Sequence, residues 1–125
     1  MDSNKFSLKS RLKSFRFAIR GFSSLLKNEH NSRIHLIATV IAISLGIILK
    51  LSFSEWSLLI IVIGIVFLTE LINSSLETLA DIIDPDWNKL IMIAKDYSAA
   101  AVLISAIIAL AVGCLIMIPK LVELL

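Results

Sequence analysis

The sequence is poor in the residues from which soluble enzymes build nucleotide and metal sites. Its four glycines are too widely spaced for a P-loop or a GxGxxG loop. A single cysteine, Cys114, excludes an internal disulfide, and Cys/His spacing typical of a zinc site is absent. The two histidines, His30 and His35, define no Ser-His-Asp set, and we interpret both as interfacial polar residues.

Charged residues are also few, at 18% of the chain, whereas 58% of its 125 residues are hydrophobic. The mean hydropathy of +0.91 is too high for an ordinary soluble domain. Three apolar stretches, at roughly 34–53, 56–83 and 97–118, are long enough to cross a bilayer, which requires about 20 residues. We therefore expect one all-α membrane domain over residues 1–125.

Residues 5–28 predict an amphipathic helix that precedes the first span. Leucine, isoleucine and phenylalanine side chains recur along one line of this helix, and lysines and arginines occupy another face. Such a helix lies on an anionic membrane surface with its apolar face among the acyl chains. A simple anchor without a catalytic duty stays open as an alternative.

The distribution of positive charge predicts the topology. Eight lysines and arginines precede the first span, and Lys89 and Lys95 flank the second connector, whereas the opposite side has only Lys50 and Lys120. The positive-inside rule places the N-terminus and the second connector in the cytoplasm. The basic residues are thus assigned to a membrane surface, and we expect no nucleic-acid partner.

The second apolar stretch contains a polar face. At 100° per residue, its five polar positions fall within about 60° of one line; they are Glu70, Asn73, Ser74, Glu77 and Asp81. Ionisable groups at membrane depth usually face a bundle interior and mark a functional site. Mutual pairing that only holds helices together is the structural alternative.

Carboxylates near this face suggest a metal and a base. Glu29, in a polar elbow at 28–33, and Glu77 can reach the same depth, and two oxygen ligands suit Mg²⁺ when phosphates and waters supply the rest. Glu70 lies about two turns deeper, where a general base could act on a buried hydroxyl. Lys95 and Asp96 offer a cation for phosphate and a second acid. We place the other turns at 54–56 and 84–89.

Residues 70–81 and 94–102 resemble the signature E-x-x-N-[ST]-x-x-E-x-x-x-D … A-K-D-x-x-[SA]-A-A-V of the small bacterial integral-membrane diacylglycerol kinases. The resemblance extends over nearly the whole chain. It implies a homotrimer in the bacterial inner membrane, with a surface helix and three spans per subunit. The implied activity is Mg-ATP-dependent phosphorylation of a membrane lipid alcohol at the cytoplasmic face.

The resemblance also implies roles for individual residues. Glu70 matches the catalytic base, and Glu29 and Glu77 match the ligands of Mg²⁺. The implied ATP contacts are Phe17, Glu29, Glu77, Asp86, Trp87, Asn88, Lys95 and Asp96, and the residues that support substrate or site are Glu70, Asn73, Ser74, Asp81 and Ala99. Phe17 lacks the phenolic hydroxyl expected at its position, and Ala99 replaces a serine found in some relatives.

Two branches share this scaffold, one acting on diacylglycerol and the other on undecaprenol. The segments 29–36 and 118–120 look more like the undecaprenol branch, which we favour. A small ion- or proton-coupled transporter subunit and a non-catalytic membrane scaffold are the competing functions. The outer halves of the spans are almost wholly apolar, which argues against a pathway through the membrane.

Overall fold

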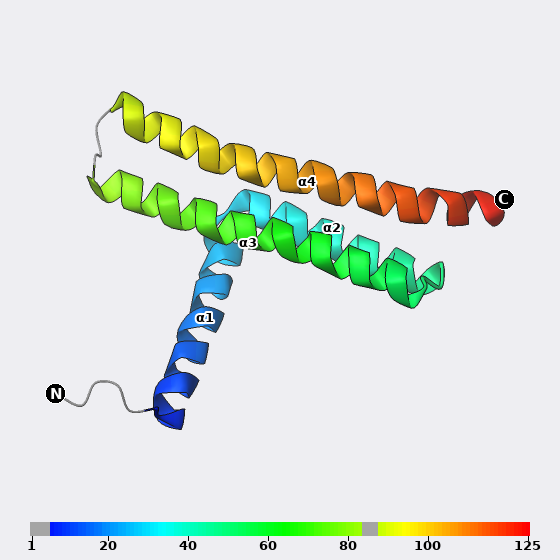
Figure 1. The fold of residues 1–125 in the computed structure, drawn as a ribbon, viewed down its shortest axis with the longest axis horizontal. Helices are drawn as coiled ribbons and strands as arrows, with labels where there is room; N and C mark the ends of the chain where they lie inside the picture. The colour runs from blue at the N-terminus through cyan, green and yellow to red at the C-terminus, as the bar shows by residue number, and fades with distance from the viewer. Residues whose placement is uncertain (1–5, 84–87) are drawn as a thin grey trace.

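The computed structural model describes residues 6–83 and 88–125, which form four helices. They are α1 (Leu8–Asn28), α2 (His30–Ile48), α3 (Phe53–Ile83) and α4 (Lys89–Glu123). Helices α2, α3 and α4 run side by side, and α1 leaves this bundle at a steep angle (Figure 1). Three helices are long and apolar enough to cross a membrane. The all-α fold predicted from hydropathy is confirmed.

Helix α1 is amphipathic and mostly exposed, and Leu25 is its one buried residue. Ser7 caps the helix by accepting a hydrogen bond from the amide of Ser10, so the helix begins at Leu8. Near its other end, the ring of Phe22 packs edge-on against Phe67 of α3, with centroids 5.5 Å apart. The apolar face is thus anchored at one end only.

The elbow between α1 and α2 is shorter than the sequence predicted, since only Glu29 lies outside the two helices. The cause is side-chain capping from α2. The buried hydroxyl of Ser32 donates to the carbonyl of Leu25 at 2.9 Å, and Arg33 Nε donates to that of Leu26 at 2.9 Å. These bonds satisfy carbonyls that the last turn of a helix leaves without partners.

The turn between α2 and α3 is also displaced from its predicted position at 54–56, because α2 ends at Ile48 and α3 begins at Phe53. Ser52 and Glu55 form a capping box: the Glu55 amide donates to Ser52 Oγ at 3.2 Å, and the Ser52 amide donates to Glu55 Oε2 at 2.7 Å. Lys50 takes a φ of 53° in this turn. Residues 54–56 therefore form the first turn of α3.

Helices α3 and α4 form an antiparallel pair joined by polar contacts along its length. Thr69 and Ser105 share a hydrogen bond of 2.8 Å, and Asn73 accepts one from Ser98. At the end next to the turn between α2 and α3, Lys120 Nζ lies 3.3 Å from Glu55 Oε2. These contacts fix the register of the two long helices.

Helix α2 is much shorter than its neighbour. It has 19 residues and α3 has 31, and the short turn between them aligns their ends on that side. At 1.5 Å per residue, α3 continues roughly 18 Å past the start of α2. We call this part of α3, residues 72–83, the overhang. It carries four of the five polar positions of α3.

Candidate active site

The carboxylate of Glu70 is buried where the overhang begins. Glu70 is only 2% exposed, and Nε2 of His35 on α2 lies 3.1 Å from its Oε1. The ring N–H does not point straight at this oxygen, so the contact is electrostatic and not a well-aligned hydrogen bond. A buried carboxylate without a partner is costly, and His35 supplies one.

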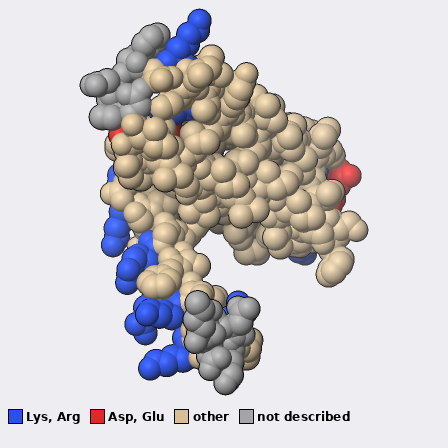
Figure 2. All heavy atoms as spheres, turned by 60° about the vertical axis from the view of Figure 1, so that its left-hand side comes forward, with Lys and Arg blue, Asp and Glu red and all other residues tan. Residues whose placement is uncertain are grey.

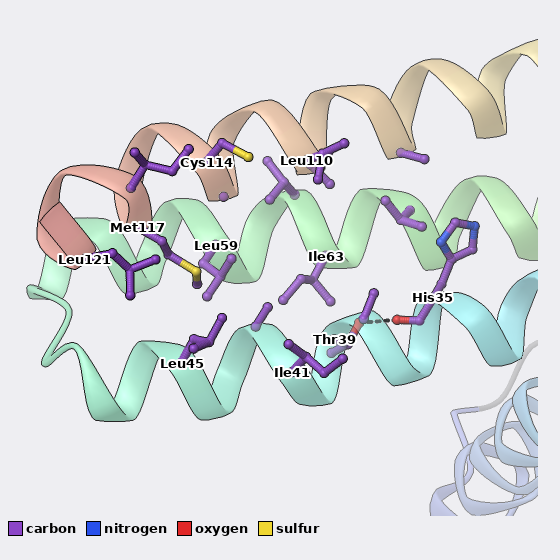
Figure 3. Close-up of a pocket in the computed structure, with 18 residues that line it drawn as sticks. His35, Thr39, Ile41, Leu45, Leu59, Ile63, Leu110, Cys114, Met117 and Leu121 are labelled. Carbon is purple, nitrogen blue, oxygen red and sulfur yellow. Dashed lines mark hydrogen bonds between the residues drawn. The ribbon is translucent and has the colours of Figure 1, made fainter.

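A long apolar groove of about 510 Å³ leads away from this pair. It is formed by α2, α3 and α4, with His35 and Thr39 at one end and Leu45, Met117 and Leu121 at the other (Figure 3). The imidazole of His35 extends from α2 toward α3 at the groove end. A hydrocarbon chain in the groove would therefore have its polar end beside Glu70.

Glu29, in the elbow between α1 and α2, and Glu77, about two turns further along α3, approach the same carboxylate. Both are partly buried, and both lie close enough to Glu70 to act on it electrostatically. Within residues 6–83 and 88–125, neither side chain forms a hydrogen bond or an ion pair, and no three His, Cys, Asp or Glu side chains gather into a metal site. Two unpaired carboxylates match a cation that takes its remaining ligands from phosphate and water.

The other polar residues of α3 mostly face α4. Asn73 is tied to Ser98, and Lys95 Nζ lies 2.9 Å from Oδ1 of Asp81. The hydroxyl of Ser74 is buried, and it has no hydrogen-bond partner in the described part of the chain. The polar face of α3 is thus divided between the pair with α4 and the acidic cluster of Glu29, Glu70 and Glu77.

The residues predicted to contact ATP differ in their exposure and in the groups that they contact. Phe17 is 51% exposed, and the guanidinium of Arg20 lies 5.6 Å from its ring centroid. Asp96 is exposed, as is the neighbouring support position Ala99. Asn88 caps α4 by accepting from the amide of Leu90 at 2.9 Å. The remaining two, Asp86 and Trp87, lie outside the described residues.

His35 is the site neighbour that the sequence did not single out. We interpreted it as an interfacial polar residue, whereas its ring contacts the most buried carboxylate of the protein. The signal available was periodicity, because His35, Thr39 and Ala42 share one face of α2 with Leu45. Only the packing of α2 on α3 shows what that face meets.

The sequence model of the prokaryotic diacylglycerol kinases matches residues 16–117 of the chain. The chain belongs to this family. The match includes all of α2 and α3 and most of α4, and with them the buried Glu70, its partner His35 and the acidic cluster.

Individual members of the prokaryotic diacylglycerol kinase family are similar over most of their length. An undecaprenol kinase of Bacillus subtilis is 36% identical over 109 residues, which cover 87% of this chain and 89% of the relative. A diacylglycerol kinase of Synechocystis is 35% identical over 91% of the chain and 66% of its own length. The diacylglycerol kinase of Escherichia coli K12 is 28% identical, covering 85% and 87% respectively.

Proposed function

We propose that this protein is a membrane lipid kinase that transfers the γ-phosphate of ATP to the hydroxyl of undecaprenol. The observation that carries this function is the position of Glu70, buried beside His35 at the polar end of an apolar groove. Membership of the diacylglycerol kinase family supports phosphoryl transfer to a lipid alcohol as the reaction class.

In the proposed reaction, the lipid places its chain in or along the groove and its hydroxyl next to Glu70. Glu70 accepts the hydroxyl proton while the lipid oxygen bonds to the γ-phosphorus. The bond between that phosphorus and the bridging oxygen breaks, and ADP leaves. Lys95, at the edge of the overhang, is assigned to the phosphates as a source of positive charge.

Glu29 and Glu77 are the residues that would hold Mg²⁺. Their carboxylates flank Glu70, and neither forms a hydrogen bond or an ion pair within the described ranges. A divalent cation bound there would neutralise charge on the ATP phosphates during transfer.

Undecaprenol is favoured over diacylglycerol as the acceptor for two reasons. The Bacillus relative named undecaprenol kinase is 36% identical over nearly its full length. The segments 29–36 and 118–120 also resemble that branch. Diacylglycerol is the second candidate, because relatives at 35% and 28% identity carry that name.

The charge distribution supports a multi-pass location in the bacterial inner membrane with the active site toward the cytoplasm. Lysine and arginine side chains gather along α1, as Figure 2 shows. Because cytoplasmic segments carry excess positive charge, α1 and the overhang belong on that side. ATP would then reach the acidic cluster from the cytoplasm.

A homotrimer is the proposed assembly. One copy leaves Glu77 and Asn73 only partly buried at the edge of a helix pair that lies in a membrane. Side chains of this kind face protein or water and not lipid. Neighbouring copies would complete their burial, and the family resemblance implies that there are two of them.

The function is tested by incubating the detergent-solubilised protein with radiolabelled ATP and either undecaprenol, diacylglycerol or ceramide. Label in undecaprenyl phosphate, with a higher kcat/KM than for the other two, is the expected result. A higher kcat/KM for diacylglycerol would make diacylglycerol, and not undecaprenol, the acceptor lipid. If no lipid is phosphorylated, the protein is not a lipid kinase, and a membrane scaffold or a transporter subunit is the function to be tested next.

A further inference from the structure

In the described part of the chain, Glu70 has the ring of His35 as its closest polar neighbour and two other carboxylates nearby. His35 lies 3.1 Å from its Oε1 on the α2 side. Glu29, from the elbow, and Glu77, about two turns further along the same face of α3, both act on it as like charges. The contact with the ring on one side and the repulsion by the two carboxylates on the other determine which way the carboxylate turns.

His35 is also part of the groove. Its ring lies at the groove end, next to Thr39 and Val66, so it borders both the apolar lining and the buried carboxylate. Its position on α2 is firm, because α2 is held to α1 by the hydrogen bonds of Ser32 and Arg33. Nε2 of the imidazole therefore lies at a fixed place between groove and acid.

From this geometry we propose that His35 is a positioning residue for Glu70. Its Nε2 holds Oε1 of the carboxylate against α2, which leaves Oε2 to accept the proton of the acceptor hydroxyl at the groove end. This inference rests on the proposed lipid kinase function and adds a residue to it. His35 itself neither takes nor gives a proton in the reaction.

The role depends on a polar nitrogen at the reach of Nε2, and two substitutions test that reach. The amide of His35→Gln can place an N–H close to the Nε2 position, whereas the amide of His35→Asn is one methylene shorter and falls short of Oε1. Both side chains are polar and uncharged, so they differ mainly in reach. If His35 only packed α2 on α3, there would be no reason for the Gln variant to have a higher kcat than the Asn variant.

The experiment measures kcat and KM for Mg-ATP in the full-length wild type and both variants, with undecaprenol and with diacylglycerol. Misplacing a reacting group by about 1 Å can cost about 100-fold in rate, which is the fall in kcat expected for His35→Asn. His35→Gln should stay within about tenfold of wild type, and both should keep the wild-type KM for Mg-ATP.

Ser105→Ala is the matched control, because it removes a buried polar contact between α3 and α4, the 2.8 Å hydrogen bond to Thr69, and leaves the contact between Glu70 and His35 in place. It should keep kcat while lowering the Tm. Thermal unfolding and size-exclusion chromatography show whether each variant is folded. If His35→Asn is unfolded, a large kcat loss in folded His35→Gln overturns the proposal, and near wild-type turnover supports it.

Equal loss of kcat in the Gln and Asn variants would also overturn the role of His35, since reach would then not matter. An unchanged kcat in a folded Asn variant would overturn this role as well. In both cases the wild type would still phosphorylate lipid, and the proposed function would stand. A wild-type protein that phosphorylates no lipid alcohol would instead overturn the function and, with it, this role.

Discussion

Lys95 Nζ lies 2.9 Å from Oδ1 of Asp81, across the contact between α4 and α3. The lysine that we assign to ATP phosphate is therefore already paired with a carboxylate of the overhang. Asp81 is the more exposed partner of the two. The pair can hold the ammonium group in place for a phosphate and exchange one oxygen ligand for another when ATP binds.

We predict that Lys95→Met raises the KM for Mg-ATP by about tenfold or more, the usual loss for one charge-assisted hydrogen bond. Asp81→Asn should change KM much less and leave the Tm nearly unchanged, because exposed ion pairs stabilise proteins little. Initial rates over a range of ATP concentrations measure both. An equal rise in KM would make the intact pair, and not the lysine alone, the ATP contact.

Glu70→Gln should lower kcat by about 100-fold to 10,000-fold, the range for loss of a general base. Its KM for Mg-ATP should stay close to wild type, because a proton acceptor acts on the transition state. Steady-state kinetics and ATP binding to the inactive protein measure the two quantities. Lost ATP binding with unaltered kcat would assign Glu70 to site organisation, and the base would have to be sought at Asp96 or Asp81.

Glu77→Gln should abolish turnover, and Glu29→Gln should nearly do so, without unfolding the protein. Each change removes one charged oxygen ligand from a site that has two. Titrating activity with Mg²⁺ at saturating ATP should show a requirement for far more metal in any residual activity. An unaltered Mg²⁺ dependence in either variant would place the metal elsewhere.

Gly46→Ala should destabilise the end of the bundle next to the turn between α2 and α3. A Cβ at this position would lie 2.7 Å from Cη2 and 3.0 Å from Cζ2 of Trp56, so the indole would have to move. Overpacking of this kind costs about 1–3 kcal/mol and should appear as a lower Tm. Gly64→Ala is the control, since nothing lies within 4 Å of its Cβ, and it should be neutral or stabilising.

Purified protein in mild detergent should elute as a trimer, as light scattering coupled to size-exclusion chromatography can measure. The physical reason is the polar face of the overhang, which needs protein or water around it in the membrane. Dilution should dissociate the assembly and reduce activity together. A monodisperse monomer with full activity would rule out the assembly.

The sequence predicts the helices well because hydropathy and periodicity are local properties. It misplaces the turn between α2 and α3, although Ser52 and Glu55 have the spacing of a capping box. It also extends the elbow to Arg33, because nothing local shows that Ser32 and Arg33 donate to carbonyls of the previous helix. Both errors come from hydrogen bonds between side chains and backbone that determine where a helix begins or ends.

The candidate site is predicted in part. A carboxylate face on α3 follows from spacing alone, and the structure places Glu29 and Glu77 near Glu70. The partners of these residues do not follow, because His35 meets Glu70 and Lys95 meets Asp81 only after three helices pack. The cap of α4 by Asn88, in contrast, can be predicted from the sequence, since an Asn directly before an apolar helix is a typical N-cap.

Because α3 is longer than α2, the thickness of the surrounding bilayer should influence the activity of the enzyme. With α2 set across the bilayer, the overhang would extend into the zone where lipid headgroups meet water, so that nucleotide and alcohol could meet without either leaving its own medium. This zone moves along the helix axis as acyl chains lengthen, since hydrophobic thickness and helix length must match. Thicker membranes would draw Glu77 and Asp81 toward hydrocarbon, so chain length in the surrounding lipids should regulate turnover.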